Sequence, residues 1–222
     1  MITIATVLKT GKFYNSSWVD KMKRSLDRHM KIPFHFLPLS DGIHDFRVNR
    51  YVQNNPGYWN KLELFRPGLY NTPTLFIDAD NVIIGDLSPL IEAVQGYKFL
   101  MYKSRVVPRR HPNPTPSSCV MYWEGDMSYI WDAWNSKPSL DWQREYSKND
   151  NTGRKGDQGF IREHAKDLNL IHDIYPNAYD MIKFVQNPQP DMTGVSMLVF
   201  AGNKKPHTCS WQIVKEEWQN DL

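Results

Sequence analysis

Apolar runs and helix-spaced apolar positions alternate along most of this chain. Residues 3–8 predict a buried strand, and a helix capped by Ser16 or Ser17 follows, with Val19, Met22, Leu26 and Met30 at helical spacing. Pro33 ends this helix, and residues 34–37 begin a second strand. A strand, a helix and a strand at this spacing indicate a βαβ unit with a right-handed crossover.

The alternation continues through the rest of the sequence. Trp59, Leu62, Phe65 and Leu69 predict an amphipathic helix directly ahead of a buried strand at 74–77. We expect further strands just after Asp80 and at 98–102, 119–123 and 195–200, and helices at 88–94, 128–135, from 157 onward and around Trp211, Val214 and Trp218. Residues 104–118 and 137–156 are expected to be irregular. The pattern predicts an α/β fold, with helices flanking a mixed central sheet.

Length, charge and cysteine content narrow the class of protein. A chain of 222 residues suits one domain with a sizeable core, and a net charge of +3 is too small to indicate a nucleic-acid binder. The two cysteines, Cys119 and Cys209, suit free thiols in a reducing compartment. The first residues lack the basic start of a signal peptide, and no apolar run approaches a membrane span. We therefore expect a cytoplasmic protein; its oligomeric state stays open.

Two aspartates directly follow the buried strand at 74–77. Because residues i and i+2 of an extended chain project to the same side, Asp78 and Asp80 are expected to converge on one point. Open α/β sheets bind ligands beyond the carboxyl ends of their strands. Paired carboxylates there suit a hard divalent cation, Mg²⁺ or Mn²⁺, which in turn suits a diphosphate.

Five landmarks in this order resemble one family. They are residues 8–14, 59–65, 76–80 (Phe-Ile-Asp-Ala-Asp), 157–159 (Asp-Gln-Gly) and 202–207. The sequence resembles GT-A glycosyltransferases, and within them the glycogenin-like and lipooligosaccharide-galactosyltransferase-like group, from Ala5 to His207. The resemblance implies a single GT-A domain over 1–222. Residues 1–100 would form its nucleotide-binding half, and 101–222 would form its acceptor half and C-terminal turn.

The resemblance also implies roles for individual residues. Asp78 and Asp80 would hold Mn²⁺ or Mg²⁺, and Asp157 and Gln158 would lie beneath the donor sugar as the catalytic pair. The implied donor-binding residues are Leu8, Tyr14 (stacking on uracil), Lys61, Asp78, Asp80, Gly202 and Lys205. Plainer interpretations exist for several of them: a solvated helix face for Lys61, a helix-dipole charge for Asp157, core packing for Tyr14 and a charged turn for Lys205.

The sequence departs from the family in two places. Many relatives have a histidine metal ligand at the end of the last strand, where this chain has Val199-Phe200-Ala201. His207 is then a candidate third metal ligand, a candidate diphosphate donor, or a structural residue. Relatives also have Asn-Ser-Gly where this chain has Ser117-Ser118-Cys119. The identity of the donor sugar therefore stays open.

The acceptor side is suggested by a proline-rich stretch with three arginines. Arg105, Arg109 and Arg110 fall where relatives place loops near the acceptor. They suit an anionic acceptor, either a phosphorylated glycan or hydroxymethylated DNA; the alternative is a solubilising loop.

The predicted function is metal-dependent transfer of a sugar from a UDP-sugar to an acceptor hydroxyl, with retention by analogy. Two alternatives belong to other classes. The first is a non-catalytic nucleotide-sugar binding protein, suggested by the absent histidine. The second is a metal-dependent nucleotidyltransferase, which ranks last because only Gly11 is present where such enzymes have a glycine-rich signature.

Overall fold

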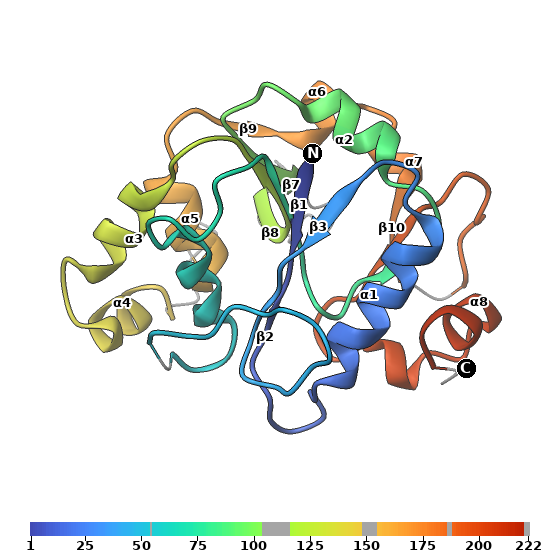
Figure 1. The fold of residues 1–222 in the computed structure, drawn as a ribbon, viewed down its shortest axis with the longest axis horizontal. Coiled ribbons are helices and arrows are strands. Elements are labelled where there is room, and N and C mark those ends of the chain that lie inside the picture. Colours follow the sequence, from blue (N-terminus) through green and yellow to red (C-terminus); the bar gives the residue numbers. More distant parts are fainter. Residues whose placement is uncertain (54, 104–115, 148–154, 186–187, 220–222) are drawn as a thin grey trace.

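A six-stranded mixed sheet forms the centre of the protein, which is seen here in a computed structural model that describes residues 1–53, 55–103, 116–147, 155–185 and 188–219 (Figure 1). The strand order is β3-β1-β5-β8-β7-β9. The bounds are Ile2–Ala5 for β1, Phe34–Phe36 for β3, Thr74–Ile77 for β5, Phe99–Lys103 for β7, Pro116–Trp123 for β8 and Leu168–Leu170 for β9. Strand β1 pairs in parallel with β3 and β5, whereas β8 runs antiparallel between β5 and β7. The predicted mixed sheet is confirmed.

Two smaller sheets extend this framework. One has the order β10-β11-β6 (Ile182–Phe184, Met197–Val199 and Val82–Ile83), and the other pairs β2 (Val7–Leu8) with β4 (Leu39–Ser40). The single strand predicted at 3–8 is therefore two strands. The backbone changes partners at Thr6, whose carbonyl accepts a bond from the Leu39 amide, so Leu8 leaves the central sheet.

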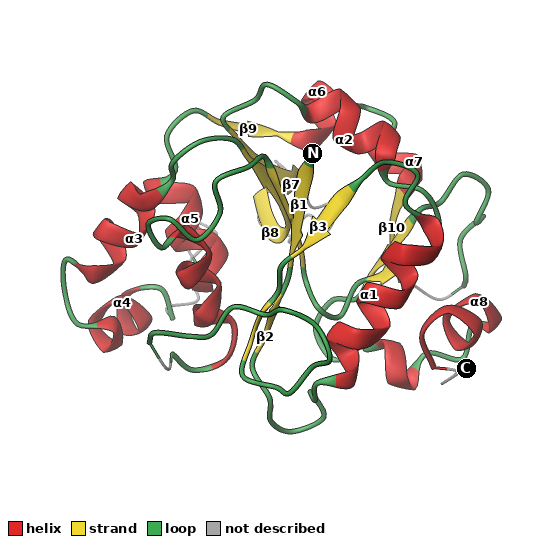
Figure 2. Ribbon diagram, in the orientation of Figure 1, coloured by secondary structure: helices red, strands yellow, loops and turns green. Residues whose placement is uncertain are grey.

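Helices cover both faces of the central sheet (Figure 2). They are α1 Ser17–His29, α2 Ser88–Val94, α3 Ser128–Asn135, α4 Ser139–Glu145, α5 Gly156–His164, α6 Ile171–Ile174, α7 Ala178–Met181 and α8 Gln212–Val214, with 3₁₀ turns η1 Gly57–Phe65 and η2 Pro206–Thr208 and a π turn η3 Lys215–Gln219. Figure 1 shows α3, α4 and α5 on one side of the sheet and α1 and α8 on the other. Within the described residues, no helix combines the length and apolarity needed to cross a bilayer.

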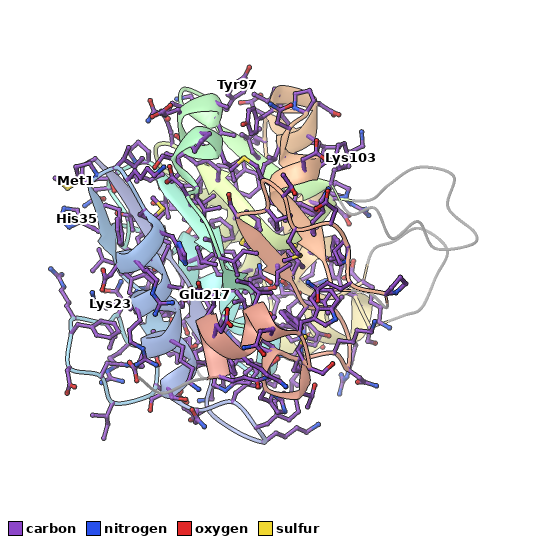
Figure 3. The ribbon with its side chains drawn as sticks, turned by 90° about the vertical axis from the view of Figure 1, so that its right-hand side faces the viewer. Met1, Lys23, His35, Tyr97, Lys103 and Glu217 are labelled. Atoms are coloured by element: carbon purple, nitrogen blue, oxygen red, sulfur yellow. The ribbon has the colours of Figure 1, made fainter. Side chains whose placement is uncertain are left out.

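The predicted helix at 17–30 is confirmed as α1. Its apolar stripe is fully buried, with Val19, Met22 and Leu26 at 0–1 % exposure. The C-terminal turn lies beside this helix, where Glu217, labelled in Figure 3, pairs with Arg28 and with His29 at 3.0 Å. The apolar stripe and this ion pair fix α1 against both the sheet and the end of the chain.

Two sequence predictions were wrong. Residues 59–65 are not amphipathic, because every residue from Trp59 to Phe65 is buried, including Asn60, Lys61 and Glu63. The polar ones find partners: the Glu63 carboxylate accepts from the amides of Val52 and Gln53 at 2.7 Å. Such partners allow a polar sequence to be buried.

The stretch 137–156, predicted to be irregular, contains α4. Trp142 anchors this helix: it is buried, and its Nε1 donates to the Trp134 carbonyl at 2.9 Å. Its ring also lies edge-on to Phe160 of α5, with ring centroids 5.0 Å apart. A seven-residue helix with one buried side chain gives little periodic signal, which is why the pattern did not show it. The elements β9, α6, α7 and β10 were missed because each has only three or four residues, too few to show a period.

Candidate nucleotide-sugar site

One cavity of about 620 Å³ lies beyond the carboxyl ends of β1 and β5. All the residues predicted to be catalytic or donor-binding line it: Leu8, Tyr14, Lys61, Asp78, Asp80, Asp157, Gln158, Gly202 and Lys205. They come from both halves of the sequence, and only folding brings them together. The structure thus places these side chains around a common space, and their individual roles stay predictions.

The two aspartates converge by a turn rather than by strand alternation. Strand β5 ends at Ile77, and Asp78 begins a turn closed by the Asn81 amide, which donates to the Asp78 carbonyl at 2.9 Å. The Asp78 amide donates to the Cys119 carbonyl of β8 at 3.0 Å, and the Asn81 side chain donates to the same oxygen at 3.2 Å. The predicted extended geometry was therefore wrong, although both carboxylates do line the cavity.

Lys61 connects two of the carboxylates. Its Nζ lies 2.8 Å from Asp78 Oδ1 and 3.3 Å from Asp157 Oδ2, and it donates to Ser118 Oγ at 3.2 Å. The Ser118 hydroxyl in turn donates to Asp157 Oδ2 at 2.6 Å. Lys61 is buried at 8 % exposure, so the interpretation as a solvated helix face is wrong.

The pKa values in this cluster follow from its burial and its charges. Burial alone lowers the pKa of Lys61, but Asp157 and Asp78 outweigh it and raise that pKa above its usual value. Burial raises the pKa of Asp78 to about 6, against the opposing charge of Lys61 and with the help of Asp80. The pKa of Asp78 thus rises chiefly because its carboxyl is buried, whereas that of Lys61 rises because two carboxylates share its ammonium.

Asp80 has its own cation. Lys205 Nζ forms an ion pair with Asp80 Oδ2, and the Tyr14 hydroxyl donates to the same oxygen at 3.4 Å. Burial lowers the pKa of Lys205, but the charge of Asp80 outweighs burial, so the pKa lies above its usual value and the ammonium stays charged. Gly202, at φ 62°, makes the turn that precedes Lys205. This turn delivers a cation to the same carboxylate that the sequence assigns to a metal.

Tyr14 is held by a tight turn and by aromatic neighbours. Gly11 and Tyr14 exchange two backbone hydrogen bonds of 2.9 Å, with Gly11 at φ 143° and Lys12 at φ 51°. The Tyr14 ring lies 4.6 Å from the ring of Trp18, centroid to centroid. Tyr14 thus both packs against its neighbours and lines the cavity, so the two interpretations made from the sequence are compatible.

His207 lies beside the cavity but does not line it. On η2, its ring centroid is 5.1 Å from that of Phe13 and 5.6 Å from that of Trp18. In the part of the chain that the structure describes, no three His, Cys, Asp or Glu side chains are grouped closely enough to bind a metal by themselves. A metal-binding role for His207 stays a prediction. Arg105, Arg109 and Arg110 fall at 104–115, outside the described residues.

Sequence reasoning missed two residues of this site. Ser118 was noted only as a departure from relatives, yet its hydroxyl joins Lys61 to Asp157. Tyr58 lies at the cavity wall, 52 % exposed. Tyr58 directly precedes Trp59, the first residue of the landmark at 59–65, and this position was the available signal. In sequence alone, however, an aromatic residue next to a tryptophan looks like core packing.

The sheet order and the cavity beyond β5 define the GT-A glycosyltransferase fold, as the sequence predicted. Among similar solved structures, an active-site mutant of the galactosyltransferase LgtC superimposes with a TM-score of 0.61 at 10 % identity, covering 99 % of this chain and 94 % of that one. LgtC in complex with donor and acceptor sugar analogs gives 0.58 at 11 %, covering 98 % and 95 %. The glycosyltransferase GlyE of Streptococcus pneumoniae TIGR4 gives 0.58 at 13 %, covering 98 % of this chain and 59 % of GlyE. No protein-family model and no curated protein sequence matches the chain.

Proposed function

We propose that this protein is a metal-dependent glycosyltransferase that moves a sugar from a UDP-sugar to an acceptor hydroxyl with retention. The observation that carries the proposal is the cavity. Three carboxylates and two lysines, in the order and positions that the GT-A resemblance assigns them, surround one space at the carboxyl edge of the sheet. A space of about 620 Å³ suits a nucleotide-sized ligand.

The carboxylates fit a divalent cation that shares its coordination with a diphosphate. Mg²⁺ and similar ions are commonly bound by one or two carboxylates together with substrate phosphates, so Asp78 and Asp80 suffice without a third protein ligand. When bound, the cation would neutralise charge on the departing diphosphate. We propose Mn²⁺ or Mg²⁺ in this role.

The chain's own residues then divide the remaining work. Lys205 and Lys61 are charged donors that can exchange a carboxylate for a diphosphate oxygen, and they stabilise the negative leaving group. Asp157 and Gln158 lie beneath the donor sugar and stabilise positive charge at its anomeric carbon. Ser118 and Lys61 fix the Asp157 carboxylate for that purpose. No strong base is required, because the leaving diphosphate can accept the proton of the acceptor hydroxyl.

We expect UDP and Mn²⁺ together to raise the melting temperature more than the sum of their separate effects. Without a nucleotide, Lys205 pairs with Asp80 and competes with a metal for it. A diphosphate gives Lys205 another partner, so metal and nucleotide bind cooperatively. The measurement is a thermal-shift panel of UDP, GDP, CDP and UDP-sugars, each with and without Mn²⁺. A larger shift with GDP or CDP would contradict the uridine assignment.

The role of His207 has a direct test. If it completes the metal or diphosphate site, His207→Ala should weaken UDP–Mn²⁺ binding about tenfold, whereas Val199→Ala should change it less than twofold. Isothermal titration of both variants gives the comparison. Equal small effects would show that the ring only packs against Phe13 and Trp18.

A non-catalytic nucleotide-sugar binding protein is the second candidate. It is favoured by the sequence Val199-Phe200-Ala201, which has no histidine where many GT-A relatives have a metal ligand. Such a protein would give the same thermal shifts yet release no UDP from any UDP-sugar. Measuring UDP release from UDP-glucose and UDP-galactose therefore separates the two candidates.

A further inference from the structure

Tyr58 is an exposed aromatic side chain in the wall of the cavity. The other aromatic side chains of the cavity lining are buried (Phe200) or half-buried (Tyr14 and Phe184), but Tyr58 is 52 % exposed while lining the same cavity as Asp157 and Gln158. Leaving a large ring half in water is unfavourable by itself, and an exposed aromatic ring at the wall of a ligand-sized cavity is typical of a binding surface.

The ring is held in place from behind. Its centroid lies 5.5 Å from that of Trp59, whose own ring stacks on Trp134 at 5.2 Å. On its other flank it abuts the backbone at the start of α5, where a Cβ on Gly156 would lie 3.1 Å from Tyr58 Cε2. Gly156 has φ 68°, so a glycine both makes the turn and leaves room for the ring. The ring is therefore pre-positioned beside Asp157.

The hydroxyl of Tyr58 remains a donor at neutral pH. Partial burial, and to a lesser extent the charge of Asp157, raise the pKa of the phenol above its usual value. A protonated phenol at the end of an exposed ring combines an apolar face with one polar contact. Pyranose rings present the same combination, with C–H groups on one face and hydroxyls around the edge.

The charges of the described lining favour a sugar over a polyanion on this side. Each lysine of the described lining is paired with at least one carboxylate: Lys9 with Asp41 at 3.0 Å, Lys61 with Asp78 and Asp157, and Lys205 with Asp80. Within the described lining, the charge that acts on the Tyr58 phenol is that of Asp157, and Lys61, three residues further along η1, is already paired with Asp78 and Asp157. This wall of the cavity therefore offers little attraction to a phosphate backbone.

We infer, on the basis of the proposed function, that Tyr58 is an acceptor-binding residue whose ring stacks on a pyranose unit of a glycan acceptor. A phosphate elsewhere on that glycan remains compatible with this contact. A flipped or single-stranded nucleobase is the competing occupant, because bases also stack on aromatic rings.

The first test is saturation-transfer NMR with methyl β-D-galactopyranoside and methyl β-D-glucopyranoside, in the presence of UDP and Mg²⁺. We expect saturation of the ring C–H protons of at least one glycoside with wild-type protein. Tyr58→Ala should reduce it at least fivefold, while Tyr58→Phe and Tyr58→Trp retain it. Leu140→Ala, at a side chain 61 % exposed on α4 and outside the cavity lining, is the matched control.

The second test is kinetic, with UDP-galactose and UDP-glucose as donors and the same glycosides as acceptors. Tyr58→Ala should raise the acceptor KM about tenfold and change kcat less than threefold, as expected for loss of a stacking contact. The UDP–Mg²⁺ thermal shift should stay unchanged, which shows that the variant is folded and binds the donor.

Several outcomes would overturn the inference. One is that neither glycoside shows saturation with wild-type protein. Another is that Tyr58→Ala gives the same signal as the wild type. The third is Tyr58-dependent binding of a hydroxymethylated oligonucleotide without binding of either glycoside. Failure of the proposed function is a different result, because it would show in the wild-type protein itself, either as no UDP–Mg²⁺ thermal shift or as a normal shift with no UDP release from a UDP-sugar.

Discussion

Asp78→Asn and Asp80→Asn are each expected to reduce UDP release from a UDP-sugar by about 10³-fold while leaving the protein folded. Each substitution removes one of the two carboxylates that we assign to the divalent cation, and an amide is a much weaker ligand for a hard metal. Initial rates with Mn²⁺ present provide the measurement. The matched control is Asp27→Asn, which removes an exposed ion-paired carboxylate on α1.

The stability of the Asp78→Asn variant follows from the raised pKa of the Asp78 carboxyl. Asp78 has its pKa raised to about 6, so its ionisation opposes folding once the pH exceeds that value. A raised carboxyl pKa contributes stability below its unfolded value near 4, and that contribution is lost as the pH rises through about 6. At pH 8, Asp78→Asn should therefore be at least as stable as the wild type in urea unfolding. Full activity of either variant, or of the wild type in EDTA, would refute the metal assignment.

Lys61→Met is expected to lower the free energy of unfolding by about 2–4 kcal/mol, which is a large effect for a single substitution. The ammonium lies 2.8 Å from Asp78 and 3.3 Å from Asp157, and its removal leaves two largely buried carboxylates without their cation. Lys23→Met is the control, because its exposed i,i+4 pair with Asp27 should contribute less than about 0.5 kcal/mol.

The origin of the Lys61 effect can be separated from packing. Without the ammonium, Asp78 takes up a proton more readily, so the destabilisation should be smaller at pH 5 than at pH 8. The double variant Lys61→Met/Asp78→Asn should recover at least half of the lost stability, since it removes one of the stranded charges. A pH-independent loss, with no recovery in the double variant, would mean that the lysine contributes through packing alone.

The sequence predicted the long, regular elements because their signals are local. The stripe of Val19, Met22 and Leu26 gave α1, and the run of Leu75, Phe76 and Ile77 gave β5. Short elements were missed where one buried side chain does the anchoring, as Trp142 does in α4. The buried stretch of η1 from Trp59 to Phe65 was mistaken for an amphipathic helix, because pattern alone cannot show that Asn60 and Glu63 have buried hydrogen-bond partners.

By itself, the sequence indicated the GT-A fold and many of the residues around the cavity, though not Tyr58 or Ser118, since strand ends and motif order are written along the chain. Only the tertiary structure decided how those residues pair. Lys61 meets Asp157, nearly a hundred positions away, both directly and through the Ser118 hydroxyl on β8, and Lys205 forms an ion pair with Asp80. It also decided that Tyr58 is half exposed beside Asp157. Such pairings depend on distances between distant segments, and a single sequence carries no local pattern for them.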